Sequence, residues 1–200
     1  MRNIDSISSR HSGFTMIEVL VSLIVITFGL LGLAGMQTRV QQAEFESYQR
    51  SQALILLYNM VDRINLNRAT APCFVVTTNT ANGSPYLGSG AAYVLACAYS
   101  TSGNNTLADN AITEWDNLLK GAAETKNGTA AGAMVGARGC VTYDSTTELT
   151  DAGGATLSGT GLYTVAVAWQ GTAPTFTPTV NCANNLYGSE TQRRVVSTNF

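Results

Sequence analysis

Residues 13–36 read GFTMIEVLVSLIVITFGLLGLAGM, and no charged residue occurs between Val19 and Met36. The only polar side chains in that run are Ser22 and Thr27, whose hydroxyls can donate hydrogen bonds back to a helix backbone. An uncharged run of about 18 residues is long enough to cross a bilayer as a helix. This segment therefore predicts a membrane anchor near the N-terminus, and the rest of the chain follows it.

Glu18 is the exception at the start of this apolar run. A carboxylate costs about 2.5–3.5 kcal/mol at the centre of an inserted helix and less near its end, so it needs a partner. If the chain is cut between Gly13 and Phe14, the new Phe14 amine is a cation at the i position and Glu18 lies at i+4, on the same helix face. The carboxylate then pairs with its own amine or with that of the next copy, which would set the register between neighbouring helices.

The sequence Gly-Phe-Thr-Met-Ile-Glu-Val-Leu at residues 13–20 resembles the class III signal of type IV pilins and pseudopilins. In that family a prepilin peptidase cuts after the glycine and methylates the new N-terminal residue, and the glutamate at mature position five aids assembly. The resemblance implies cleavage after Gly13, N-methylation of Phe14 and an assembly role for Glu18. A signal anchor with an incidental acid is the alternative interpretation.

Three further motifs resemble PilV-type minor pilins. They are GLLGLAGMQ at 29–37, YTVAVAWQG at 163–171, and Cys182 followed by RRVVS at 193–197. Residues 70–130 carry no comparable match. The resemblance implies a pilin-like fold, and as partners the prepilin peptidase, other major and minor pilins and the inner membrane.

The N-terminal half is expected to form one long helix, because no proline precedes Pro72. The helix is predicted from Phe14 to about Arg68, with an apolar stripe in its second half that includes Leu54, Leu57, Val61 and Ile64. Glycines recur at 29, 32 and 35, either to let helices approach closely or to mark a segment that can melt. The expected organisation is a leader at 1–13, a hydrophobic transmembrane and assembly helix at 14–38, an amphipathic continuation at 39–70 and a disulfide-bonded globular head at 71–200.

The head is predicted to be a small α+β domain, an antiparallel sheet packed on the long helix. Residues 162–169 are the clearest strand, because Tyr163, Val165, Val167 and Trp169 alternate with smaller side chains. The other expected strands are 134–143, 194–198 and a short one at 73–76. Asp109 or Asn110 is expected to cap a helix that ends before Gly121.

Four cysteines, Cys73, Cys97, Cys140 and Cys182, all follow the anchor. An even number in an exported domain predicts two disulfides. Four cysteines allow three pairings and the sequence does not decide between them; sequential pairing, Cys73–Cys97 and Cys140–Cys182, is our choice. Free buried thiols are the alternative. A zinc site is disfavoured, because no C-x-x-C occurs and the one histidine, His11, lies in the leader.

The composition argues against several function classes. Charged residues make up 12 % of the chain, about half the usual share, and the formal net charge is −2. Apart from the Arg193-Arg194 pair no basic patch is visible, so no nucleic-acid partner is expected. Neither a phosphate-binding loop nor a nucleophile elbow occurs, so neither an enzyme nor a cofactor is expected.

The expected function is that of a minor pilin, which co-assembles into a type IV pilus or its initiating tip complex. The expected location is the inner membrane as a single-pass protein with a periplasmic head, and then the pilus and cell surface. Two alternatives remain at this point: a type II secretion pseudopilin, and an adhesin or DNA-uptake module carried on a pilin anchor.

Overall fold

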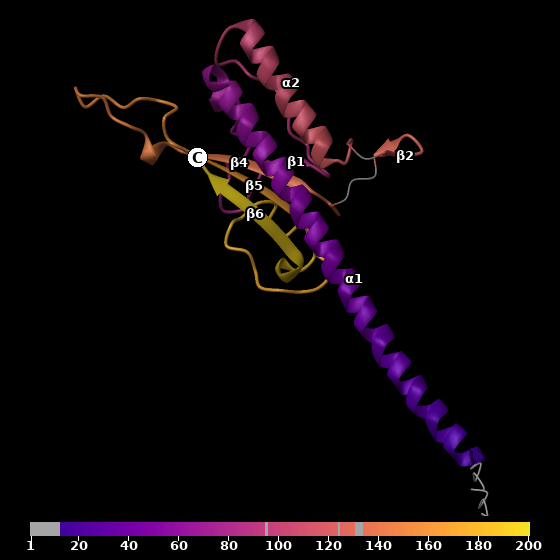
Figure 1. The fold of residues 1–200 in the computed structure, drawn as a ribbon. Helices are drawn as coiled ribbons and strands as arrows, with labels where there is room; N and C mark the ends of the chain where they lie inside the picture. Colours follow the sequence, from indigo (N-terminus) through magenta and orange to yellow (C-terminus); the bar gives the residue numbers. More distant parts are fainter. Residues whose placement is uncertain (1–12, 95, 124, 131–133) are drawn as a thin grey trace, which may run out of the picture. The chain divides into compact units, whose positions relative to one another are not determined.

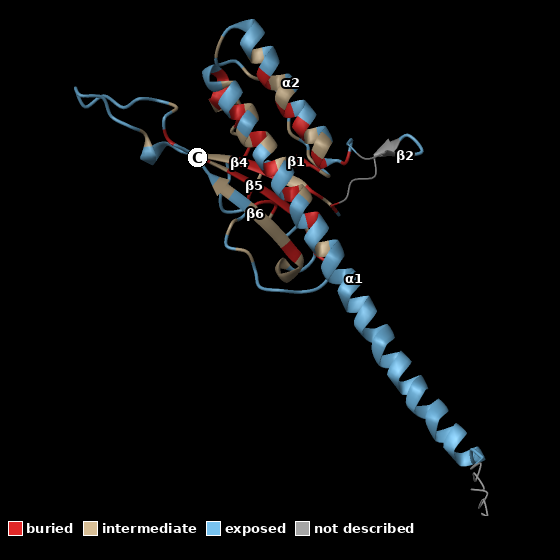
Figure 2. Cartoon of the chain, in the orientation of Figure 1, coloured by how far each residue is buried: buried red, intermediate tan, exposed pale blue. Residues whose placement is uncertain are grey.

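In the computed structural model, residues 13–94, 96–123, 125–130 and 134–200 are described; Met1 to Ser12 of the predicted leader lie outside them. α1 (Met16–Leu66) is one continuous helix, as the absence of proline predicted. The chain divides within it into two units, one ending at Ala43 and the other comprising Glu44–Phe200. The second unit holds the sheet and all the buried residues of the described chain, which Figure 2 colours red.

In the second unit, α1 buries the face formed by Gln49, Ala53, Leu57, Met60 and Ile64. These positions recur every three or four residues, as expected for one side of a helix. Leu57 and Ile64 belong to the predicted stripe, but Leu54 is 38 % exposed. More than one apolar stripe can be drawn along this part of α1. The stripe that packs on the sheet includes Ala53 and Met60 in addition to Leu57 and Ile64, and it leaves Leu54 partly exposed.

The sheet is antiparallel with the order β1-β4-β5-β6, and Figure 1 shows α1 crossing in front of it. Its strands are β1 (Leu87–Gly88), β4 (Arg138–Asp144), β5 (Leu162–Gln170) and β6 (Arg193–Asn199). A separate ribbon pairs β2 (Thr125–Lys126) with β3 (Thr129–Ala130). Short 3-10 helices are η1 (Arg68–Phe74), η2 (Ser145–Thr147) and η3 (Glu190–Gln192). The fold is thus the predicted pilin-like α+β arrangement, a long N-terminal helix packed on a four-stranded antiparallel sheet.

Both faces of the sheet are covered. Side chains of β4 and β5 point alternately to the two faces, so alternate residues enter different cores. Val165 and Val167 pack with α1 and with α2 (Ser102–Leu119) in the larger core. Ala166 and Ala168 face a smaller core with Tyr187 and Cys182, from the segment before β6. The alternation predicted for residues 162–169 is therefore confirmed, and its small side chains serve the second core.

α2 begins eight or nine residues earlier than predicted. Its N-cap is Thr101, whose side chain accepts a hydrogen bond from the amide of Asn104 at 3.4 Å. Asp109 lies within the helix and accepts a hydrogen bond from the amide of Cys97 at 3.2 Å. The capping prediction at Asp109 or Asn110 is therefore wrong. Residues 102–108, SGNNTLA, have little apolar periodicity of their own, and Ala108 is buried only by tertiary packing.

The strand predicted at 73–76 is also wrong, because η1 runs through Phe74, and the amides of Val75 and Val76 donate back to the Pro72 and Phe74 carbonyls at 3.2 and 2.9 Å instead of to a strand. Two disulfides hold this region and the smaller core. Cys73 is bonded to Cys97, and Cys140 to Cys182, which is the sequential pairing chosen above. The first joins η1 to the segment before α2, and the second joins β4 to the segment before β6.

Candidate assembly helix

The residues predicted to function in processing lie together where α1 begins. Gly13, Phe14 and Thr15 precede the helix, and the amides of Glu18 and Val19 donate to the Thr15 carbonyl at 3.1 and 3.3 Å. Glu18 occupies the first turn, where the free amides and the helix dipole favour a negative charge. Phe14 is 83 % exposed, so both sides of the predicted cleavage point are open to solvent.

The polar side chains in the apolar run are satisfied inside the helix. The Ser22 hydroxyl donates to the Glu18 carbonyl at 2.5 Å, and the Thr27 hydroxyl donates to the Ile24 carbonyl at 2.8 Å. This is the back-bonding predicted from the sequence, and it lowers the cost of placing a hydroxyl in lipid. Glu18 is therefore the one group in the first 18 residues of α1 whose side chain still requires an external partner.

The apolar surface of α1 is uncovered over the length of a membrane span. Among the residues that the structure describes, α1 is the one helix long and apolar enough to cross a bilayer, and its most apolar stretch is not buried against any other described part of the chain. Exposed apolar surface of this extent indicates lipid or other apolar helices as its surroundings.

The glycines of this segment have no packing role among the described residues. A Cβ built on Gly29, Gly32 or Gly35 would meet nothing within 4 Å. The helix nevertheless continues through all three, although each glycine costs up to about 1 kcal/mol relative to alanine. Contacts within the described chain do not explain them, which is consistent with the predicted close approach of neighbouring helices.

A polar cluster that the sequence did not predict joins α1 to the head. The Oε1 atom of Glu46 accepts hydrogen bonds from the Thr172 amide at 3.0 Å, the Thr172 hydroxyl at 2.8 Å and the Arg194 guanidinium at 3.1 Å. Burial acts to raise the pKa of Glu46, but these hydrogen bonds and the Arg194 charge outweigh it, so the pKa lies below its ordinary value. No local pattern signals a contact between residues so far apart in sequence.

The described residues contain no group of three or more His, Cys, Asp and Glu side chains placed to hold a metal ion. Gly13, Phe14 and Glu18 lie close together because they are near neighbours in sequence, and the four cysteines form two disulfides in the second unit. What this chain presents is therefore an uncovered apolar helix with one acid near its start, followed by a disulfide-bonded head.

Comparison with known families identifies that N-terminal segment. Residues 8–34 match the prokaryotic N-terminal methylation motif. No curated protein and no solved structure matches the chain. The chain therefore combines the methylation motif of type IV pilins and pseudopilins with a long N-terminal helix and a pilin-like α+β head. The motif implies processing by a prepilin peptidase, and proteins of this pilin-like kind are generally structural rather than enzymatic.

Proposed function

We propose that this pilin-like chain is a minor pilin, a structural subunit that co-assembles through α1 into a type IV pilus or its initiating tip complex. The observation that carries the proposal is the methylation motif at residues 8–34 on a helix whose apolar surface is uncovered. Residues 14–38 are the assembly segment, residues 39–70 continue it, and residues 71–200 form the head. Before assembly the protein is held in the inner membrane with its head in the periplasm.

Assembly exchanges lipid contacts for helix–helix contacts, which are similarly apolar, so polar pairing adds specificity to the close packing of small residues. In the proposed mechanism the peptidase cuts after Gly13, Phe14 is methylated, and the new amine pairs with Glu18 of a neighbouring subunit. Both groups lose water in the assembled helix bundle, and an unpaired charge there costs several kcal/mol. Glu18 thereby favours the correct register over the many apolar alternatives.

The processing step is tested by intact-mass and N-terminal analysis of the protein from its native host. The mature chain is expected to begin at methylated Phe14. A mature chain that retains residues 1–13 would contradict the proposal. The same sample from a strain without prepilin peptidase is the control and should retain the leader.

The location of the protein is tested by comparing its amount in membranes with its amount in fibres sheared from the cell surface. A minor pilin is expected in the sheared fibres in small amounts together with the other pilins. A type II secretion pseudopilin shares the N-terminal motif but remains in the envelope. Absence from the sheared fibres, together with loss of protein secretion when the chain is removed, would favour that alternative.

A further inference from the structure

The two edges of the sheet differ in how they are protected. At one edge, β1 has only two residues, and the amide of Thr77 covers the next part of β4 by donating to the Val141 carbonyl at 2.9 Å. At the other edge, β6 extends over seven residues, Arg193–Asn199, without a proline. A long edge strand of this kind is a template for pairing with another chain.

The register shows which backbone groups of β6 are free. Tyr163 and Phe200 exchange both hydrogen bonds at 3.1 Å, so Thr198 and Val196, at even spacing from Phe200, also point their amides and carbonyls toward β5. The amides and carbonyls of Val195, Ser197 and Asn199 therefore point away from the sheet. In the described part of the chain these amides donate no hydrogen bond and these carbonyls accept none, and Ser197 and Asn199 are exposed.

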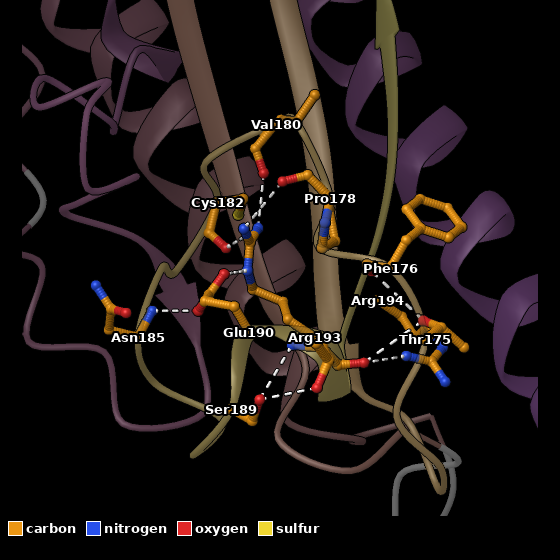
Figure 3. A network of polar contacts seen from close by, with 11 residues as sticks. Thr175, Phe176, Pro178, Val180, Cys182, Asn185, Ser189, Glu190, Arg193 and Arg194 are labelled. Carbon is orange, nitrogen blue, oxygen red and sulfur yellow. Dashed lines mark hydrogen bonds and ion pairs between the residues drawn. The ribbon is translucent and has the colours of Figure 1, made fainter.

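An apolar groove adjoins the start of this edge. It has a volume of about 300 Å³ and is lined by Arg50, Trp169, Thr175, Phe176, Pro178 and residues 193–196. The Phe176 ring, 82 % exposed, is the largest uncovered side chain in it. Figure 3 shows the segment that carries this ring beside Arg193 and Arg194.

That segment is held in place rather than free. Arg194 Nη2 donates to the Ala173 carbonyl at 2.6 Å, Arg193 Nη1 donates to the Val180 carbonyl at 2.6 Å, and the Thr175 amide donates to the Thr191 carbonyl at 2.8 Å. These bonds bracket Phe176 on both sides. The groove is thus already formed without a ligand, which reduces the entropy lost on binding.

The groove also carries an unmatched positive charge. Arg50, Arg193 and Arg194 line it. Arg193 is paired with Glu190 at 2.6 Å, and Arg194 is paired with Glu46, which already accepts three hydrogen bonds through Oε1. Arg50 is exposed and forms no ion pair within the described residues. A guanidinium beside an apolar groove fits a carboxylate best.

We propose that the open edge of β6 binds an extended strand of a different subunit, with an apolar side chain of that strand against Phe176 and an Asp or Glu side chain on Arg50. Hydrogen bonds between the two main chains supply the affinity, and the apolar and acidic side chains of the incoming strand determine which partner binds. A second copy of β6 does not fit, because Arg193–Asn199 contains neither Asp nor Glu. This inference rests on the proposed function, since it supplies the head-to-head contact of the same assembly.

The edge is tested with Ser197→Pro and its matched control Ser197→Ala. The amide of Ser197 points outward, so proline removes the docking donor without removing a bond to β5. Ser197→Pro is expected to lower the amount of the chain in sheared fibres several-fold, and Ser197→Ala to leave it unchanged. Disulfide formation and thermal unfolding of the full chain in detergent check that each variant is folded.

The charge is tested with Arg50→Glu against Arg68→Glu, which changes another exposed arginine, at the start of η1. Arg50→Glu is expected to reduce fibre incorporation and Arg68→Glu to leave it near wild type.

Hydrogen exchange of the wild-type chain is a test that needs no variant. The amides of residues 195, 197 and 199 should exchange more slowly in fibres than in detergent. Equal exchange in both states would overturn the proposal even if Ser197→Pro does not fold.

The outcomes separate this inference from the proposed function. If the wild-type chain is absent from fibres, the proposed function fails. If it enters fibres and Ser197→Pro and Arg50→Glu enter equally well, only the edge proposal fails. Concentration-dependent dimers in detergent that Ser197→Pro abolishes and Arg50→Glu does not affect would show pairing of two copies, and would also overturn it.

Discussion

Gly139 of β4 lies directly against the indole ring of Trp115 of α2: a Cβ built on Gly139 would fall 2.0 Å from the Cη2 atom of Trp115. The ring is fully buried, and its Nε1 donates to the Leu56 carbonyl of α1 at 2.8 Å. One tryptophan thus contacts the sheet on one side and the long helix on the other. The missing side chain at 139 is what permits α2 to pack this close to the sheet.

We predict that Gly139→Ala destabilises the head by about 1–3 kcal/mol or more, because the added methyl group overlaps a ring that is packed on every side. The free energy of unfolding of the full chain in detergent, from urea titration, measures the effect. Gly103→Ala is the matched control, since a Cβ there meets nothing within 4 Å and lies in the first turn of α2. That variant should be neutral or slightly more stable, so equal losses in both would contradict the packing argument.

Two buried tyrosines should respond oppositely to loss of the hydroxyl. The Tyr163 hydroxyl is buried without a hydrogen-bond partner among the described residues, whereas that of Tyr187 donates to the Gly136 carbonyl at 2.9 Å. Tyr163→Phe is therefore expected to be neutral or stabilising, and Tyr187→Phe to cost about 0.5–1.5 kcal/mol. Urea unfolding at neutral pH compares them; a larger loss for Tyr163→Phe would contradict the assignment.

The same residues predict a loss of stability in alkali. Burial raises the pKa of Tyr163 to about 12 and that of Tyr187 to about 12, although Arg138 acts in the opposite direction at Tyr187. Tyrosine in the unfolded chain has a pKa of about 10. Between pH 10 and pH 12 the folded state therefore binds more protons than the unfolded state. Stability should be independent of these groups below pH 10 and fall as pH rises toward 12. Tyr163→Phe should reduce that slope, and an unchanged slope would show that Tyr163 does not contribute.

The disulfides should contribute much of the stability of the head. They close loops with sequence separations of 24 and 42 residues, and the chain-entropy relation gives each about 3–4 kcal/mol. Replacing Cys140 and Cys182 together by alanine is expected to lower the free energy of unfolding by about 2–5 kcal/mol. Peptide mapping without reductant identifies the pairs in exported protein, and a Cys73–Cys140 link or four alkylatable thiols would contradict the predicted pairing.

Glu18→Ala should separate membrane insertion from assembly. Removing the charge makes α1 more apolar, so insertion and cleavage after Gly13 should be retained. Incorporation into sheared fibres should fall sharply, because the Phe14 amine of a neighbour loses its counter-charge, and an unpaired buried charge costs several kcal/mol. Glu18→Gln should fail less completely, because it still accepts a hydrogen bond. If Glu18→Ala enters fibres as well as wild type, the pairing mechanism is wrong.

Several elements followed from local sequence alone. The uncharged run from Val19 to Met36 and the absence of proline before Pro72 predicted one long apolar helix, and α1 is that helix. Alternation in residues 162–169 predicted the central strand. These predictions succeed because helix and strand periodicities are local properties, and because a long apolar run has few alternatives to a membrane helix.

Other features were decided only by tertiary packing. The face that α1 buries is chosen by the sheet among overlapping stripes, and α2 begins at Ser102 because Thr101 caps it and the core buries Ala108. The hydrogen-bonded clusters around Glu46 and Arg193 connect residues that are far apart in sequence, and no local sequence pattern predicts these contacts. The open edge of β6 is a property of strand order, because a strand sequence does not state whether a neighbour covers it. Long-range pairing is what creates the burial, the polar partners and the free edges of this head, and it exists only in the folded chain.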